Sequence, residues 1–227
     1  MIIPIGIDCQ VADVLRKYKL RKFAFPFDWV VTYKGVSNIF KNNFNNYLPK
    51  NDGILILDKE SGILFVHNLF PKDNDKLTKR INRLNNILET TKDKVTFIKK
   101  GHTGHQHDEH DGFFDKIDDI NDVIQLDKFL KNKYPKLKFE IILALKCGKC
   151  YKKDLEYKVK SKNIKIYNLA ANYDNKEDLE RLIKKIYNIN KICIYNNLCF
   201  DSYRILYFSI FIFFIIIFFA LKFFKFI

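Results

Sequence analysis

The fold is decided by the stretch IPIGIDCQVADVLRKYKLRKFAFPFDWV, residues 3–30. It opens with a strand-like apolar run at residues 2–7 and continues into a helical pattern. The apolar face of that pattern consists of Val11, Val14, Leu15 and Leu20. Cys9 therefore lies where a strand gives way to a helix. The positive end of a helix dipole favours a thiolate, and the backbone N–H groups of Cys9 and Gln10 could bind an oxyanion. This position suits a nucleophile, although a free cysteine is more often a small buried hydrophobic residue.

The spacing of this stretch resembles the signature of a family, DUF1796, whose members are described as papain-like cysteine peptidases of bacteria and large DNA viruses. The signature is GxxCxxAxxL, then LR, then PFDW. The matching residues are Gly6, Cys9, Ala12, Leu15, Leu20, Arg21, Pro26, Phe27, Asp28 and Trp29. The family usually opens Ser-Leu-Gly where this chain has Pro-Ile-Gly, and the resemblance extends to about residue 100. It implies a nucleophilic Cys9 more firmly than it implies any particular substrate.

Asp28 and His67 complete the catalytic hypothesis for the N-terminal half. Two strand-like runs, GILILD at 53–58 and GILFVH at 62–67, predict a hairpin. In the family a histidine commonly follows such a strand, often before Asp, whereas here His67 precedes Asn. A thiol nucleophile needs an imidazole within hydrogen-bonding reach and a third group that orients the ring. We therefore predict His67 as the base and Asp28 as the orienting acid. The alternatives are a structural His67 and an Asp28 that caps a turn or the next helix. PFDW itself is expected to be a loop or an extended stretch, with Trp29 and Phe27 inserted into the core.

Four of the five histidines lie in the segment GHTGHQHDEHDG, residues 101–112. His105 and His107 are alternative bases, because this segment follows a predicted strand and α/β sheets place their sites at the carboxyl ends of strands. Imidazoles interleaved with carboxylates could instead hold a divalent metal. The spacing HxxHxH is not a dedicated zinc motif, however, and a polar loop with incidental histidines is a third interpretation. We assign no metal and no cofactor.

Strand and helix patterns alternate through the remainder of the chain. Helices are predicted at 36–48, 74–90, 117–133 and 175–189, and strands at 95–101, 139–146 and 163–170. This alternation predicts an α/β fold in which a mainly parallel sheet is flanked by helices on both faces. The predicted domain, residues 1–190, is long enough to bury a sizeable core.

Charge and cysteine usage narrow the functional classes. Lys and Arg number 40 against 26 Asp and Glu, a net charge of +14, but the lysines are scattered along the sequence and no nucleic-acid motif accompanies them. We therefore expect no nucleic-acid partner. The five cysteines form no regular framework, and no secretory signal is recognised, so a reducing compartment is expected. The pair Cys147 and Cys150 forms a CxxC that lacks a second CxxC, which disfavours a zinc or redox role.

The C-terminal segment ILYFSIFIFFIIIFFAL, residues 205–221, contains only Ser209 as a polar residue and is flanked by Arg204 and Lys222. A helix of this length spans about 25 Å, the short end of a membrane span, and flanking lysines can extend it. We expect a transmembrane tail anchor at 205–224 after a linker at 191–204, with the domain facing the cytosol.

Three functional hypotheses follow. The first is a membrane-anchored cysteine peptidase or other hydrolase, with a protein or peptide as its substrate. The second is a non-catalytic, membrane-tethered protein-interaction module, for example of viral origin. The third, which has the least support, is a metal-binding protein that uses the histidine-rich segment.

Overall fold

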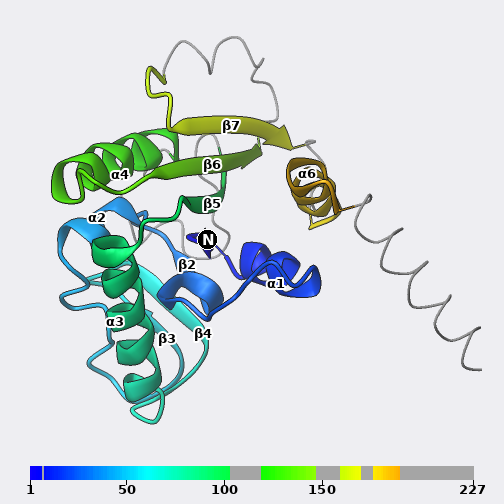
Figure 1. Ribbon diagram of the computed structural model, residues 1–227. Helices are drawn as coiled ribbons and strands as arrows, with labels where there is room; N and C mark the ends of the chain where they lie inside the picture. The colour runs from blue at the N-terminus through cyan, green and yellow to red at the C-terminus, as the bar shows by residue number, and fades with distance from the viewer. Residues whose placement is uncertain (7, 103–118, 147–158, 170–175, 190–227) are drawn as a thin grey trace, which may run out of the picture. The chain divides into compact units, whose positions relative to one another are not determined.

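The computed structural model of the chain describes residues 1–6, 8–102, 119–146, 159–169 and 176–189 (Figure 1). Residues Met1–Glu180 group into one compact unit, and Arg181–Ile227 form a second unit, of which only residues 181–189 are described. The boundaries predicted at 190 and 204 lie at or beyond the end of the described residues and stay predictions.

Four parallel strands form the main sheet, sheet A. Their order is β1 (Ile2–Pro4), β5 (Val95–His102), β6 (Phe139–Lys146) and β7 (Ile164–Leu169). The central strand β6 is buried throughout Ile141–Leu145, as expected for a parallel strand covered on both faces. The predicted α/β fold with a mainly parallel sheet is thus confirmed for the described residues.

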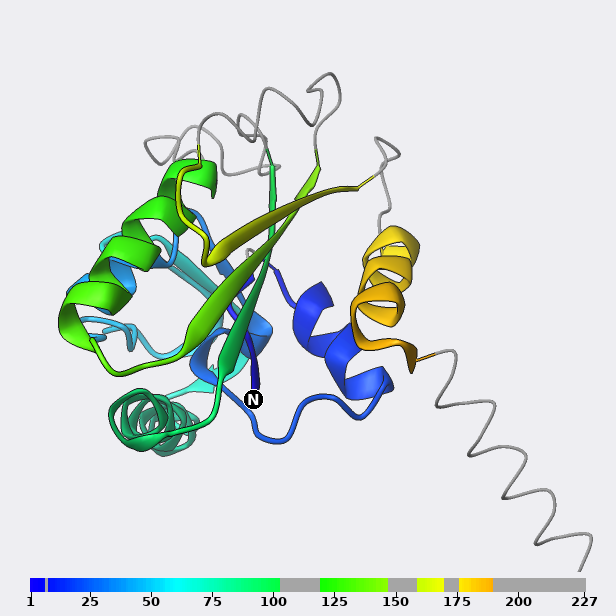
Figure 2. The ribbon, with the colours of Figure 1, turned by 45° about the horizontal axis from the view of Figure 1, so that its top comes forward.

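Helices cover sheet A on both faces. Figure 2 shows α1 (Gln10–Lys17) on one face and α4 (Asp119–Lys133) on the other. Successive residues of a strand point to opposite faces, and β5 uses this alternation: Lys99 contacts α4, whereas Lys100 reaches the start of α1. The long helix α3 (Asn74–Thr90) and the later helix α6 (Lys176–Tyr187) form close to their predicted ranges.

The predicted hairpin forms, but it belongs to a second sheet. Strands β3 (Gly53–Asp58) and β4 (Ile63–Phe70) pair antiparallel, and β2 (Val30–Thr32), which the sequence pattern missed, pairs with β4. Strands joined by a short turn must pair antiparallel, whereas parallel neighbours need a long crossover connection. The hairpin therefore cannot supply neighbouring strands of the parallel sheet, and with β2 it forms a separate antiparallel sheet in the order β2-β4-β3.

An aromatic cluster fills the core beside this second sheet. It consists of Phe27, Phe40, Phe44, Tyr47 and Phe65, whose neighbouring ring centroids lie 5.4–6.0 Å apart. The buried hydroxyl of Tyr47 donates to the carbonyl of Pro26 at 2.6 Å. Aromatic rings packed in this way stabilise the core beyond the burial of their apolar area, because they favour particular stacked or edge-to-face arrangements. They bind the segment after α1 to the strands of the hairpin.

Three local predictions in this region were wrong. PFDW is a 3₁₀ helix, η1 (Pro26–Trp29), and Trp29 is only partly buried, although Phe27 is in the core as expected. The helix predicted over 36–48 is the short α2 (Ser37–Lys41). Its early end is explained by Asn43, Phe44 and Asn46, which have positive φ values of 52°, 61° and 59°. Asparagine adopts this left-handed conformation more readily than most residues and so ends helices.

A buried ion cluster joins β5, α2 and α4. The ammonium of Lys99 lies 2.8 Å from Asp119 Oδ1 and 2.6 Å from Asp122 Oδ2, and all three residues are buried. Asp122 also accepts the backbone N–H groups of Val36 and Ser37 at 3.0 and 2.9 Å, at the start of α2. Burial opposes the charges, but Lys99 holds the pKa of Asp122 below its ordinary value and the two carboxylates raise the pKa of Lys99.

None of the helices among the described residues is long and apolar enough to cross a membrane. The apolar segment 205–221, on which the membrane prediction depends, lies outside the described residues.

Candidate functional site

Cys9 follows β1 and occupies the N-cap position of α1, with its side chain half-buried. The turn that places it there depends on Gly6, since a Cβ at residue 6 would come within 2.7 Å of the carbonyl oxygen of Asp8. The hydroxyl of Thr32, from β2, donates to the Gly6 carbonyl at 3.1 Å and holds the turn against the second sheet. The expectation that Cys9 lies at a strand-to-helix turn is therefore confirmed.

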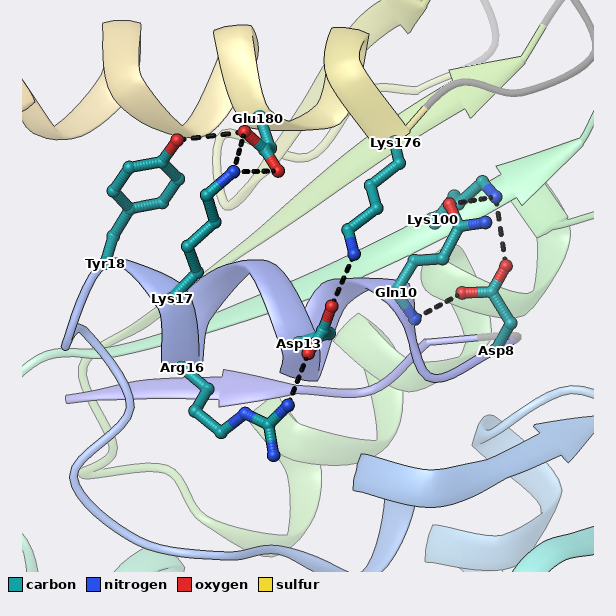
Figure 3. Close-up of polar contacts among 9 residues, drawn as sticks. All are labelled: Asp8, Gln10, Asp13, Arg16, Lys17, Tyr18, Lys100, Lys176 and Glu180. Atoms are coloured by element: carbon teal, nitrogen blue, oxygen red, sulfur yellow. Dashed lines mark hydrogen bonds and ion pairs between the residues drawn. The ribbon is translucent and has the colours of Figure 1, made fainter.

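A buried ammonium binds the two residues that flank the cysteine, Asp8 and Gln10 (Figure 3). Lys100 Nζ is 2.9 Å from Asp8 Oδ2 and 2.8 Å from Gln10 Oε1, and Lys100 is only 6% exposed. The second oxygen of Asp8 accepts the backbone N–H of Gln10 at 2.9 Å. That N–H group, which the sequence suggested as an oxyanion donor, is therefore already engaged. Asp8 and Lys100 were missed from the sequence; the available signal was a pair of lysines at the end of an otherwise apolar strand.

The surroundings of Cys9 disfavour its thiolate. Burial raises the pKa of the Cys9 thiol, and the carboxylates of Asp8 and Asp13 raise it further. Lys100 and a backbone hydrogen bond act in the opposite direction but do not reverse the shift. The helix-dipole argument made from the sequence is thus outweighed by desolvation and neighbouring negative charge. At neutral pH the group is a thiol, so nucleophilic use of Cys9 requires a base that removes its proton.

His67 lies on β4 with its side chain exposed. Its ring packs edge-to-face against Trp29, with centroids 5.6 Å apart. Arg16 and Arg21 also contact this ring: their guanidinium carbons lie 5.2 and 5.7 Å from the Trp29 centroid. Within the described part of the chain, no hydrogen bond joins His67 to Cys9. Its role as the base stays a prediction.

Asp28 is fully buried within η1. One of its oxygens lies 2.5 Å from Arg21 and accepts the N–H of Phe25 at 3.0 Å; the other has no hydrogen-bond partner among the described residues. Burial raises the pKa of Asp28 to about 6, although Arg21 opposes the shift. Asp28 therefore caps η1, and its ion pair with Arg21 joins the Leu-Arg motif to PFDW. Its contacts do not include His67, so the orienting role also stays a prediction.

The outer face of α1 carries further polar contacts, centred on Asp13 and Glu180 (Figure 3). Asp13 lies 2.7 Å from Arg16 and 2.6 Å from Lys176, and Glu180 accepts from Lys17 and Tyr18 at 2.8 and 2.9 Å. Asp13 is one helical turn beyond Cys9, and these cations hold the pKa of Asp13 below its ordinary value. Asp13 is therefore charged over the physiological range, and its charge is one of those that raise the pKa of the Cys9 thiol.

The other predicted site residues lie outside the described residues. They are His105 and His107, together with the rest of the histidine-rich segment after His102 and the CxxC at 147–150. Among the residues that the structure does describe, no group of three His, Cys, Asp or Glu side chains is arranged to hold a metal ion.

Comparison with known proteins concerns the N-terminal segment. Residues 1–52 match the family model described as "Putative papain-like cysteine peptidase (DUF1796)". No curated protein and no solved structure matches the chain. The matched segment includes Cys9, Arg21 and Asp28 but ends before His67.

Proposed function

We propose that this chain is a cysteine hydrolase of the peptidase type, with Cys9 as its nucleophile and a histidine as its general base. The observation that carries the proposal is the position of Cys9. It lies in the family-matched segment, at the N-terminus of α1, with the buried ammonium of Lys100 bound to both flanking residues. The carboxyl ends of parallel strands, where Cys9 follows β1, are where α/β sheets commonly place their sites.

The proposed reaction starts with proton transfer from the Cys9 thiol to the imidazole. The thiolate then attacks the carbonyl carbon of an amide or ester, the imidazolium protonates the leaving group, and an acyl-thioester remains on Cys9. Water, deprotonated by the same imidazole, hydrolyses the thioester and restores the thiol. Because the pKa of the free thiol is raised, the base is essential rather than auxiliary. The candidates for this base are His67, His105 and His107, with Asp28 as the proposed orienting acid.

The proposal includes a membrane anchor at 205–224, which places the domain on the cytosolic side. It is supported by the uniformly apolar composition of residues 205–221 and by the basic residues on either side. The test is flotation of the full chain with phosphatidylcholine vesicles. Retention on the vesicles after alkaline carbonate washing supports the anchor, and release by carbonate contradicts it.

Catalysis is tested with the full chain in detergent, using a pool of fluorogenic peptides and esters. We expect Cys9→Ala to abolish turnover and Cys193→Ala to leave it unchanged, which controls for general thiol loss. Single alanine substitutions of the five histidines then identify the base, whose loss should lower kcat/KM by about 10²–10⁴-fold. Turnover that survives Cys9→Ala would exclude Cys9 as the nucleophile.

The alternative function is a non-catalytic, membrane-tethered interaction module. It is favoured by the raised pKa of Cys9 and by the packing of His67 against Trp29 instead of against the thiol. The measurement that separates the two functions is the pH dependence of Cys9 alkylation by iodoacetamide. An apparent pKa that shifts on substitution of one histidine supports the hydrolase. A high pKa that no histidine substitution alters supports the interaction module.

A further inference from the structure

The turns before three neighbouring strands of sheet A share one pattern, Lys-x-Lys. It occurs as Lys92-Asp93-Lys94 before β5, Lys136-Leu137-Lys138 before β6 and Lys160-Ser161-Lys162 before β7. The three motifs lie far apart in the sequence. Because the strands are parallel and adjacent, their starts meet at one edge of the sheet. We call the six lysines of these motifs the lysine edge.

Backbone and side-chain contacts hold the lysine edge together. The N–H of Val95 donates to the carbonyl of Lys138 at 2.8 Å, and the N–H of Ile141 donates to that of Asn163 at 2.7 Å. Lys131, from α4, donates to the hydroxyl of Ser161 at 2.9 Å. The turns before β5, β6 and β7 are therefore fixed relative to one another by strand pairing.

A hollow of about 510 Å³ opens among these turns. Four ammonium-bearing side chains line it, together with Tyr134 and Pro135; they are those of Lys94, Lys131, Lys138 and Lys162. Its volume is within the range of sites that bind small ligands. A concave surface lined by several cations is suited to an anionic group.

The positive charge of the lysine edge is only partly compensated. Lys94 pairs with Glu140, and Lys131 pairs with Asp127, while Asp93 lies between two lysines of the edge. The other lysines of the edge are exposed and make no ion pair with any residue that the structure describes: Lys92, Lys136, Lys138, Lys160 and Lys162. Exposed, unpaired lysines on neighbouring turns repel one another, and this repulsion is relieved when an anionic partner binds.

We propose that the lysine edge binds the headgroups of anionic phospholipids at a membrane surface. Clustered lysines bind such surfaces through their negative potential, and basic hollows accept phosphate-bearing headgroups. The aromatic residues that line the hollow, Tyr134 and Phe139, are buried. The described part of the hollow therefore offers no exposed stacking platform of the kind that single-stranded nucleic acid requires. The choice of a lipid partner rests on the proposed membrane anchor, which would hold the domain at a bilayer.

This contact would set the orientation of the domain. Strand β5 has eight residues, and at about 3.3 Å per residue it separates the two edges of the sheet by roughly 25 Å. Cys9 follows the carboxyl end of β1 and therefore lies toward the edge opposite the lysine edge. The lysine edge on the bilayer would keep the Cys9 site facing away from the lipid and open to soluble substrates.

The test uses the full chain bound to vesicles of phosphatidylcholine, with or without one third phosphatidylserine. Amine acetylation by a water-soluble reagent is followed at each lysine by peptide mass spectrometry. A lysine near an anionic surface gains roughly fivefold in binding, so we expect acetylation of Lys138 and Lys162 to slow about fivefold with phosphatidylserine. High salt should remove this protection because it screens the attraction. Lys72 and Lys79, which are exposed on other parts of the domain, serve as internal controls.

A quadruple variant with Lys136, Lys138, Lys160 and Lys162 changed to Gln is compared with a charge-matched control. The control changes Lys22, Lys72, Lys79 and Lys128, which are also exposed, to Gln. If the chain does not float with phosphatidylcholine alone, the membrane anchor is overturned. Phosphatidylserine-dependent flotation that is lost only in the edge variant would then still support the lysine edge. Equal acetylation rates on both vesicles would overturn the lipid contact, as would protection by single-stranded RNA in place of phosphatidylserine.

Discussion

Replacing Lys99 by Met is the most direct test of the buried ion cluster. The methionine side chain keeps much of the apolar volume of lysine but removes the ammonium that lies 2.8 and 2.6 Å from Asp119 and Asp122. Two carboxylates then remain in the interior, where Asp119 is 4% and Asp122 is 1% exposed. Asp122 still accepts hydrogen bonds from the two N–H groups at the start of α2. These bonds offset part of the free-energy cost of leaving the two carboxylates buried without a cation.

The expected loss of unfolding free energy is about 3–5 kcal/mol, the usual cost of removing one partner from a buried pair. For a domain of this size, that corresponds to a fall in Tm of roughly 6–20 °C. Changing both carboxylates to Asn in the Lys99→Met background should recover most of the loss, because no buried charge is left unpaired. If the ion cluster did not stabilise the fold, Lys99→Met would lower the unfolding free energy by well under 1 kcal/mol.

The loss should also depend on pH. In the natural chain the pKa of Asp122 is held below its unfolded value, so its contribution is present at neutral pH and is lost as the pH falls through the folded pKa. Without Lys99, burial raises the folded pKa of this carboxyl above the unfolded value, opposed only by the two N–H groups of α2. The variant then loses stability as the pH rises. The difference in unfolding free energy between the natural chain and the variant should therefore be largest near pH 7 and smaller near pH 4.

The assay is thermal unfolding of the full chain in detergent, followed by the fluorescence of Trp29, the only tryptophan. Lys128→Met, an exposed substitution on α4, removes the same charge without touching the cluster and should change stability by no more than about 0.5 kcal/mol. Equal destabilisation by the two substitutions would refute the argument. A deficit for Lys99→Met that stays constant between pH 4 and pH 7 would refute it as well.

Three further predictions concern the candidate site and its frame. Asp8→Asn should lower the pKa of Cys9 and speed its alkylation at pH 7, while Lys100→Met should raise that pKa and slow the reaction; iodoacetamide kinetics that respond in the opposite sense would contradict the electrostatic account. Because the folded pKa of Asp28 is raised to about 6, the natural chain loses stability from this group as the pH rises from about 4 to 6. The Tm of Asp28→Asn, measured by circular dichroism, should therefore increase relative to the natural chain over that range, and parallel profiles would count against the shift. Gly35→Ala should destabilise by roughly 2 kcal/mol or more in urea unfolding, because its φ is +77° and the new Cβ would lie 2.6 Å from a buried carboxylate oxygen; an unchanged midpoint would show that the loop adapts freely.

Much of the fold could be predicted from local pattern. The strand at residues 95–101, the helix at 74–90 and the strand at 139–146 were each recognisable because the hydrophobic period identifies an element without reference to its neighbours. Their alternation then favoured a parallel sheet, which the structure confirms. What pattern alone missed was β2, which is only three residues long, and the assignment of the hairpin to a second sheet.

The candidate site was predicted less completely. Cys9 could be singled out because a strand-to-helix turn and a family-like spacing are both visible in one segment of the chain. Lys100 could not, because it approaches Cys9 only through the pairing of β1 with β5, about 90 residues away in sequence. The direction of the Cys9 pKa shift was also inaccessible, since burial and the placement of Asp8 outweigh the helix dipole.

By itself, the sequence determined the α/β class, the turn at Cys9 and the apolar character of residues 205–221, because each depends on residues close together along the chain. The tertiary structure alone decided which charges meet. It sends Lys99 and Lys100 to opposite faces of β5, pairs Arg21 with Asp28, and gathers the scattered Lys-x-Lys turns at one edge. The physical reason is that electrostatic energies depend on separation and burial in space, and a parallel sheet brings together residues that the sequence keeps far apart.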